Sequence, residues 1–277
     1  MLTEAQIKGK IKKLAKEKNA DARVLMRMYM MEHFLERLAV SKYSDNFVIK
    51  GGILVTAILG VSLRTTMDID TSIRNINLTE DDATQIVTEI ISINLDDGVT
   101  FNIKNVTKIM DEMEYQGIRL SLEACMSGMT TAIKIDISTG DVITPRAIEY
   151  NYRLMLEEKS IKLWSYNLET VLAEKIQTIL SRGVLNTRMR DFYDVYLLKI
   201  LYDKNIDKDI LKKAFGETCN YRGTVNLIED GINVLNLIEN NQEMITLWKR
   251  YQQKYEYARD IKFENIMDVL KKIILEL

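Results

Sequence analysis

The stretch "KGGILVTAILGVSLRTTMDID", residues 50–70, joins two predicted strands through two glycines and a short helix. The run 46–50 is typical of a buried strand, the apolar run that ends at Gly60 has helical length, and 66–75 alternates like a strand. Gly51 and Gly52 have no Cβ, so the backbone there can pass close to a ligand. The helix that follows offers unpaired N–H groups. We interpret the pair as opening a phosphate-binding turn, although a Gly-Gly pair taken alone is more often an ordinary turn.

Two carboxylates close this stretch. Asp68 and Asp70 are two positions apart on a predicted strand, so both point to the same face. Side by side on a half-buried strand they repel each other, and a divalent cation with a preference for oxygen ligands removes that conflict. The pattern therefore predicts a Mg²⁺ (or Mn²⁺) site. The alternative is a solvent-exposed face, with Ile69 as the inward residue.

A third carboxylate lies in "AIKIDIST", residues 132–139. Asp136 stands between isoleucines in a strand-like run. If this strand neighbours that of Asp68 and Asp70, three carboxylates can surround one or two metal ions, activate a hydroxyl and stabilise a leaving pyrophosphate. Asp136 alone would be read as an exposed edge residue.

The second half of the chain contains charged residues on two predicted helices. "LETVLAEKIQTILSR", residues 168–182, is a predicted helix that Asn167 caps. Lys175 and Arg182 are two turns apart and close enough to the same face to bind one polyanion.

"RMRDFYDVYLL", residues 188–198, follows shortly afterwards. Asp191 and Asp194 share a helix face, and Arg188 and Arg190 precede them. An exposed helix with ordinary ion pairs is the alternative interpretation, which the strongly apolar run after it disfavours.

The remaining patterns predict an α+β protein. Two helices capped by Thr3 and Asp21 come first, and a helix capped by Thr79 follows the carboxylate pair. Five further strand-like runs indicate a mixed or antiparallel sheet; they lie at 99–110, 118–124, 131–139, 150–156 and 160–166. From residue 168 onward the chain is almost wholly helical, so we expect two domains that pack together with a site in the cleft between them.

Composition narrows the protein class. The chain has 277 residues, 38 basic and 40 acidic side chains and a net charge of -2, so bulk charge favours neither a nucleic-acid coat nor a membrane surface. No apolar run reaches the about 20 residues that span a bilayer. We expect a cytoplasmic protein without membrane partners. "LWKRYQQKYEYARDIKF", residues 247–263, mixes basic and aromatic residues. We read it first as an ordinary helical face with solvated charges, and second as a contact for RNA or a partner protein.

The motifs "GGILV", "RTTMDID", "KIDIST", "AEKIQT" and "RMRDFYDVYLL" together resemble the AbiEii/AbiGii toxin family, which includes the mycobacterial MenT relatives. These are toxins of bacterial abortive-infection toxin–antitoxin systems with a nucleotidyltransferase fold like that of DNA polymerase β. The resemblance implies a mixed-sheet nucleotidyltransferase domain at 1–165 with N-terminal helices and an all-α domain at 166–277. It also implies an enzyme that takes an NTP, releases pyrophosphate, is neutralised by a cognate antitoxin and modifies RNA, as some relatives modify the acceptor end of tRNA.

The resemblance also assigns roles to residues. Gly51 and Gly52 match the glycine motif, although relatives often have serine at the second position. The implied catalytic residues are Asp68, Asp70, Lys175 and Asp194; the nucleotide-binding residues are Gly51, Gly52, Arg64, Lys175, Arg182, Arg190 and Asp191; the metal ligands are Asp68, Asp70 and Asp136. For Arg64 a surface salt bridge is an equal alternative, and Asp194 is either the partner that orders Lys175 or a base.

Two other functions compete with this one. A nucleotide-binding module could arrest growth or sense phage without catalysing transfer, because metal–nucleotide binding needs the same residues. A resistance-type enzyme that adenylylates a small molecule would share the first half of the motifs only, and the helical motifs at 173–178 and 188–198 count against it.

Overall fold

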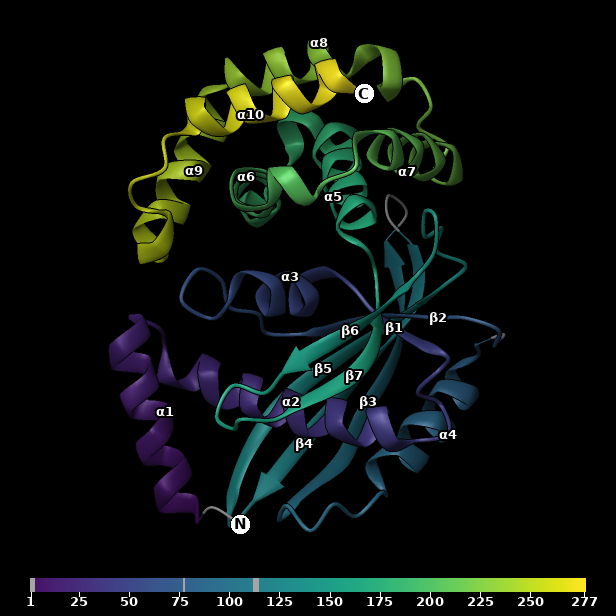
Figure 1. Cartoon of the computed structure of the whole chain (residues 1–277), viewed down its shortest axis with the longest axis vertical. Coiled ribbons are helices and arrows are strands. Elements are labelled where there is room, and N and C mark those ends of the chain that lie inside the picture. The colour runs from purple at the N-terminus through teal and green to yellow at the C-terminus, as the bar shows by residue number, and fades with distance from the viewer. Residues whose placement is uncertain (1–2, 77, 112–114) are drawn as a thin grey trace. The chain divides into compact units, whose positions relative to one another are not determined.

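The structure, a computed structural model, describes residues 3–76, 78–111 and 115–277 (Figure 1). It divides into two compact units. Unit 1 comprises Met1–Asp141 and Ala147–Tyr166, and unit 2 comprises Val142–Arg146 and Asn167–Leu277. Each unit is described separately below.

Unit 1 combines one sheet with four helices. Its helices are α1 (Glu4–Lys18), α2 (Ala22–Val40), α3 (Gly51–Leu59) and α4 (Glu80–Ile91). Its strands are β1 (Phe47–Ile49), β2 (Ile69–Ile73), β3 (Val99–Asp111), β4 (Tyr115–Met126), β5 (Met129–Thr139), β6 (Ile148–Arg153) and β7 (Ser160–Ser165). Every strand-like run in the sequence corresponds to one of these strands.

The seven strands form a mixed sheet in the order β3-β4-β5-β2-β1-β7-β6. β2 pairs in parallel with β5 and β1 in parallel with β7, whereas the other neighbours are antiparallel. β2 and β5 therefore occupy interior positions. On β5 the isoleucines 133, 135 and 137 are buried on one face and Asp136 and Ser138 on the other, as expected for a strand covered on both sides.

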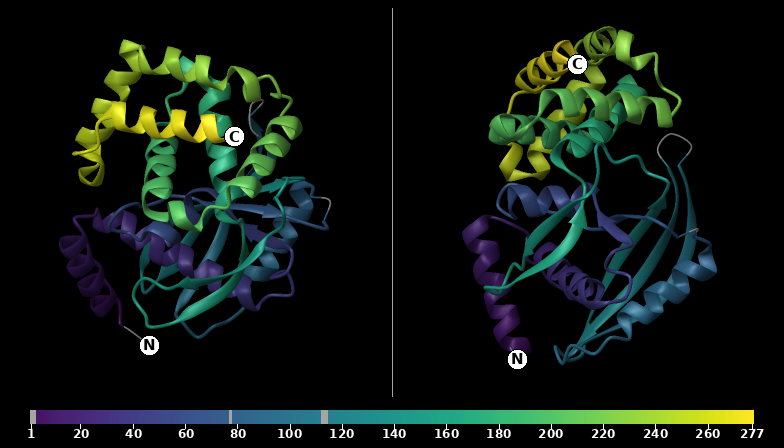
Figure 2. Two further views of the ribbon diagram at one scale, coloured as in Figure 1. Left: turned by 45° about the horizontal axis from the view of Figure 1, so that its top comes forward. Right: turned by 45° about the vertical axis from the view of Figure 1, so that its right-hand side comes forward.

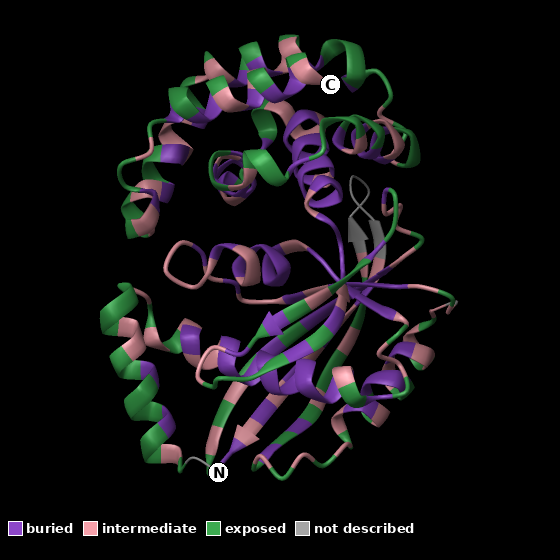
Figure 3. Cartoon of the chain, viewed as in Figure 1, coloured by how far each residue is buried: buried purple, intermediate pink, exposed green. Residues whose placement is uncertain are grey.

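The helices of unit 1 begin where the sequence predicts. Thr3 and Thr79 form capping boxes with Gln6 and Asp82, and Asp21 caps α2 by accepting from the Arg23 N–H. α2 and α4 contact each other and pack on the sheet, and Figure 3 shows buried residues along α2. These contacts place the apolar side of α2, including Met28, Met30 and Met31, in the core.

Unit 2 is helical. Its helices are α5 (Leu168–Arg182), α6 (Met189–Tyr202), α7 (Lys208–Tyr221), α8 (Leu227–Glu239), α9 (Gln242–Lys254) and α10 (Phe263–Glu276), with short 3₁₀ turns η1 (Gly183–Leu185), η2 (Asp203–Asn205) and η3 (Glu256–Ala258). α5 packs against α6, α7 and α8, and α10 runs beside α8 (Figure 2). Because α5 has neighbours on several sides, even its polar residues in the middle are buried.

Candidate active site

The sheet brings two of the predicted metal ligands together. Asp70 on β2 lies directly opposite Asp136 on the parallel neighbour β5. Asp68 precedes β2 and, like Asp70, is half-buried, while Asp136 is only 4% exposed. Asp136 is therefore not an exposed edge residue, and the condition on which its role depended, a neighbouring strand, is met.

Asp70 also contacts the glycine motif. Its Oδ2 accepts a hydrogen bond from the Gly52 N–H at 2.7 Å. Gly51 has φ +53°, and a Cβ on it would lie 2.5 Å from Asp70 Oδ2; a Cβ on Gly52 would lie 2.6 Å from Thr66 Oγ1. The glycines thus permit the close approach of β2 to the start of α3.

This contact corrects one detail of the sequence prediction. The helix was expected to begin after the glycines, but α3 begins at Gly51. The Asp70 carboxylate binds a first-turn N–H of α3, where an anion is favoured, so the glycine pair lies inside the helix.

The electrostatics of Asp70 point to a missing positive charge. Burial raises its pKa, the Gly52 N–H opposes that rise, and the carboxylates of Asp136 and Asp68 add to it. A divalent cation would relieve this repulsion, and three carboxylates are the donors that Mg²⁺ prefers. Asp68, Asp70 and Asp136 therefore supply the type of ligand that a magnesium ion takes.

Arg119 on β4, which the sequence analysis missed, binds Asp136. Its Nε and Nη2 donate to Asp136 Oδ1 and Oδ2 at 2.7 and 2.6 Å, a bidentate pair. Arg119 and Asp136 are directly opposed on antiparallel strands, and only that register revealed the pairing. Asp136 is thus already neutralised by one cation.

Two basic residues hold the glycine motif in place. Arg64 is 2% exposed, and its Nη1 donates to the Gly52 carbonyl at 2.9 Å and to Thr56 Oγ1 at 3.0 Å, so it is a buried residue and not a surface one. Lys50, which the sequence analysis did not select, is 3% exposed, and its Nζ lies 2.7 Å from Asp141 Oδ2. The position of Lys50 directly before Gly51 is the sequence feature that could have identified it.

The predicted residues of unit 2 form a second group. Lys175 Nζ on α5 lies 2.7 Å from Asp191 Oδ1 and 2.8 Å from Asp194 Oδ2, both on α6. Asp194 is fully buried. The expected shared face of the two aspartates is confirmed, and they do not lie on an exposed helix. Complete burial and the ion pair favour Asp194 as the group that orders Lys175 over Asp194 as a base.

The two predicted arginines flank this triad. Arg182 is the last residue of α5 and is half-buried. Arg190 on α6 donates from Nη2 to the Tyr255 hydroxyl at 3.2 Å, and its guanidinium lies 5.8 Å from that ring. The sequence prediction contained no tyrosine partner.

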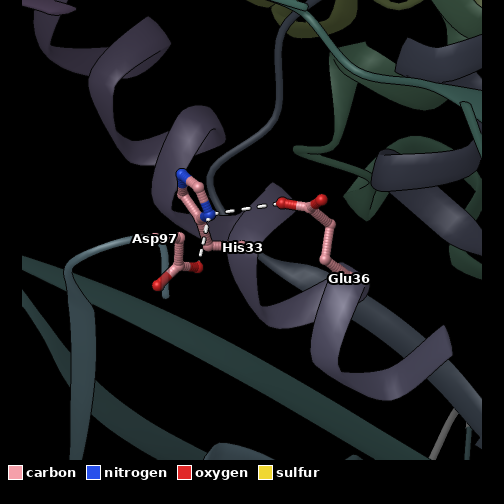
Figure 4. A group of neighbouring side chains, drawn as sticks. All are labelled: His33, Glu36 and Asp97. Atoms are coloured by element: carbon pink, nitrogen blue, oxygen red, sulfur yellow. Dashed lines mark ion pairs between the residues drawn. The ribbon is translucent and has the colours of Figure 1, made fainter. Parts of the chain in front are cut away.

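Another cluster with metal-ligand chemistry lies on α2. His33 Nδ1 is 2.9 Å from Asp97 Oδ2 and 3.2 Å from Glu36 Oε2, and Figure 4 shows this nitrogen facing both carboxylates. Arg37 binds Asp97 through both oxygens, and Lys159 pairs with Glu36. Because these cations already balance both carboxylates, we interpret the cluster as an ion-pair network that ties α2 to residues 97 and 159. His33 itself is buried.

This network predicts a pH-dependent stability. Burial alone would lower the pKa of His33, but the carboxylates of Asp97 and Glu36 outweigh it and raise the pKa to about 9. A folded pKa above the unfolded value of about 6.5 means that the stabilisation is complete below pH 6.5 and is lost as the pH rises through 9. Its size is on the order of 3 kcal/mol.

His33→Gln is the variant that isolates this effect. We expect it to have a free energy of unfolding well below that of the wild type at pH 6 and close to it at pH 10, measured by urea denaturation. Glu32 interacts with His33, and burial raises the pKa of Glu32 to about 8, so both proteins are compared in a Glu32→Gln background that removes this titration. A difference that does not change with pH would contradict a charged His33.

The glycine geometry gives a second prediction. Gly51→Ala should destabilise the protein by more than the roughly 1–2 kcal/mol of a left-handed alanine, because its Cβ also collides with Asp70. Gly223→Ala is the matched control, since Gly223 has φ +66° and nothing lies within 4 Å of its added Cβ. Urea denaturation that found equal losses for both variants would contradict the close approach of Asp70.

The sequence profile of the nucleotidyl transferase AbiEii toxin of type IV toxin–antitoxin systems matches residues 33–269. The chain belongs to this family. No curated protein matches the sequence. The AbiEii resemblance expected from the motifs is thereby confirmed, and with it the nucleotidyltransferase activity and the role as a toxin.

Solved structures agree with the AbiEii fold. JHP933 from Helicobacter pylori has a TM-score of 0.52 at 13% identity, covering 92% of this chain and 91% of its own. Another H. pylori structure has a TM-score of 0.53 at 13% identity, covering 92% and 94%. At this identity the similarity shows the fold alone. It confirms the expected mixed sheet with a helical C-terminal region.

None of the helices in residues 3–76, 78–111 and 115–277 combines the length and apolarity needed to cross a bilayer.

Proposed function

We propose that this AbiEii toxin is a metal-dependent nucleotidyltransferase that transfers a nucleotide from an NTP to RNA, at the acceptor end of tRNA. The observation that carries the proposal is the carboxylate group of the sheet, in which Asp70 faces Asp136 and lies close enough to Asp68 for its pKa to rise. The acceptor hydroxyl attacks the α-phosphorus, the bond to the β-phosphate breaks, and pyrophosphate leaves.

In this proposal Asp68 and Asp70 hold Mg²⁺ or Mn²⁺. Asp136 is the third candidate ligand, although it shares its oxygens with Arg119. When bound, the metal neutralises the charge that develops on the phosphates.

The other residues of unit 1 shape the nucleotide site. Gly51 and Gly52 have no Cβ, so Asp70 can come close to the start of α3 and accept from the Gly52 N–H. The other N–H groups of that turn are the donors toward phosphate. Arg64 donates a hydrogen bond to the Gly52 carbonyl. It therefore supports the glycine turn, and we place its positive charge on the carbonyl side of that turn.

In unit 2 we assign charge compensation to Lys175, which offsets negative charge as pyrophosphate leaves. Asp194 and Asp191 fix the position of its ammonium group. Arg182 and Arg190 are further candidates for nucleotide contacts, and their role remains a prediction.

The biological setting follows from the AbiEii family. A type IV toxin–antitoxin system supplies an antitoxin partner. We propose that the toxin acts in the cytoplasm, where its RNA acceptor and nucleotides are found, and that it protects bacterial populations against phage.

The test is a transfer assay. Purified protein is incubated with Mg²⁺, total bacterial tRNA and each α-³²P-labelled NTP in turn, and the RNA is separated on a denaturing gel. We expect one NTP to label tRNA in a reaction that EDTA abolishes. Absence of labelled RNA with all four nucleotides, together with measurable NTP binding, would contradict the proposal and favour a non-catalytic nucleotide-binding module.

A further inference from the structure

A basic and aromatic segment of unit 2 has no role in the site described above. Residues 248–262 contain five basic and two acidic side chains in a chain whose net charge is -2. The five basic residues, Lys249, Arg250, Lys254, Arg259 and Lys262, are all exposed. The segment is therefore a local positive surface on a protein without overall positive charge.

Its aromatic residues fall into two kinds. Trp248 and Tyr251 are 1% and 8% exposed and belong to the core. Tyr255 and Tyr257 are half-buried, and their rings stack 5.2 Å apart at 19° between planes. An ordinary helical face explains the first pair, and the Tyr255–Tyr257 pair contacts Tyr251 and extends from this core to the partly exposed surface.

Cations gather on one of these rings. Lys254 Nζ lies 5.3 Å from the centre of the Tyr255 ring and the Arg190 guanidinium 5.8 Å from it. Arg250 is four residues before Lys254 on α9, on the same face. Within the described residues, neither Arg250 nor Lys254 pairs with a carboxylate, whereas Arg259 pairs with Glu256. Two positive charges are thus free to bind an anion.

This surface adjoins the motif helix of the same unit. Tyr193, the neighbour of Asp194 on α6, lies 4.9 Å from the Tyr257 ring, centre to centre. Arg190 belongs to the "RMRD" motif and reaches Tyr255. The tyrosine pair and its cations are therefore continuous with the Lys175–Asp191–Asp194 triad.

We propose that Arg250, Lys254, Tyr255 and Tyr257 form a docking surface for single-stranded RNA, which holds the acceptor strand by base stacking and phosphate contacts. This inference rests on the proposed function, because it names the surface that binds the RNA acceptor. Stacking rings next to unpaired cations are the chemistry that binds single strands without sequence readout. An acidic protein would bind the charges but would have no need of the partly exposed tyrosine rings.

The test measures RNA binding by the full chain. Fluorescence anisotropy with a fluorescein-labelled single-stranded RNA of about 12 nucleotides, a length within the usual site sizes, gives Kd at several salt concentrations. The test variant is Arg250→Glu/Lys254→Glu. The control is Lys204→Glu/Lys212→Glu, two exposed lysines of unit 2 that make the same change in net charge.

We expect the test variant to raise Kd by about 10-fold or more at 0.1 M salt and to reduce the slope of log K against log salt by at least about 1.4. The control should bind as the wild type does. Tyr255→Leu should raise Kd by about 5-fold or more with an unchanged slope, because it removes stacking and no charge. Thermal unfolding of each variant checks the fold.

Equal RNA affinity in the test and control variants would contradict the proposed docking surface. Labelling of tRNA by the wild type would still support the proposed function in that case. Conversely, RNA binding that depends on Arg250 and Lys254 without any nucleotide transfer would support the surface and contradict the proposed function. If the test variant keeps its RNA affinity but escapes neutralisation by the antitoxin, the surface binds protein and the inference is wrong.

Discussion

Asp68→Asn and Asp70→Asn are each expected to lower the rate of nucleotidyl transfer by about 10²-fold or more, the effect of losing one preorganised electrostatic group. Asparagine keeps the size of the side chain and removes the charge that a divalent cation needs. In Asp70→Asn the amide oxygen can still accept from the Gly52 N–H, so the start of α3 is retained. The loss of activity should therefore occur without loss of fold.

The measurement is the initial rate of RNA labelling at saturating NTP, with thermal unfolding recorded for each variant. Asp81→Asn, an exposed aspartate in the first turn of α4, is the matched control and should keep wild-type activity. The double variant should be little worse than either single one, because two ligands of one ion act as a unit. If Asp68→Asn transferred nucleotide at the wild-type rate, Asp68 would not be a catalytic residue.

Lys175→Met is expected to lower the free energy of unfolding by about 3–5 kcal/mol, since it leaves two buried carboxylates without their cation. Asp191 retains Arg188, whose Nε lies 3.1 Å from its Oδ2, but Asp194 is fully buried. Most of the loss in stability should therefore come from the buried charge of Asp194. Addition of Asp194→Asn to this variant should recover part of the loss, because a neutral amide replaces a buried carboxylate that has lost its lysine partner.

Lys199→Met provides the control for this prediction. Lys199 is also buried and pairs with two carboxylates, Asp203 and Glu276, but their side chains are 55% and 24% exposed. Water can solvate these carboxylates once the lysine is gone, so we expect a loss of about 1 kcal/mol or less. Urea denaturation of both lysine variants compares the two cases directly. Similar losses would show that the Lys175 group is no more desolvated than a surface pair.

Local sequence patterns were sufficient for most of the secondary structure. The caps at Thr3, Asp21, Thr79 and Asn167 all start helices where the sequence predicts them. A short apolar run at 46–50, alternation at 66–75 and β-branched residues in the later runs identified every strand of the sheet. Capping and alternation depend on residues within a few positions of each other, so they can be read without knowledge of the fold.

Partners distant in sequence were not predictable in this way. Arg119 and Asp136 are 17 residues apart and meet only because β4 and β5 pair in one register. Arg190 and Tyr255 are 65 residues apart, on elements that the helical packing of unit 2 brings together. Arg64 was weighed as a phosphate ligand or a surface ion pair, and neither alternative anticipated a buried arginine that binds the backbone of α3.

The sequence by itself determined the chemical inventory of this AbiEii toxin: the glycine pair, the aspartates on alternating strand positions and the charged helical motifs. Spacing along a strand or helix sets which side chains share a face, so the candidates could be selected. Only the tertiary structure decided that Asp136 stands opposite Asp70, that Gly52 donates to Asp70, and that Lys175 is buried between two aspartates. Strand order, register and burial arise from packing of the whole unit, and they set the charge and hydration of each group.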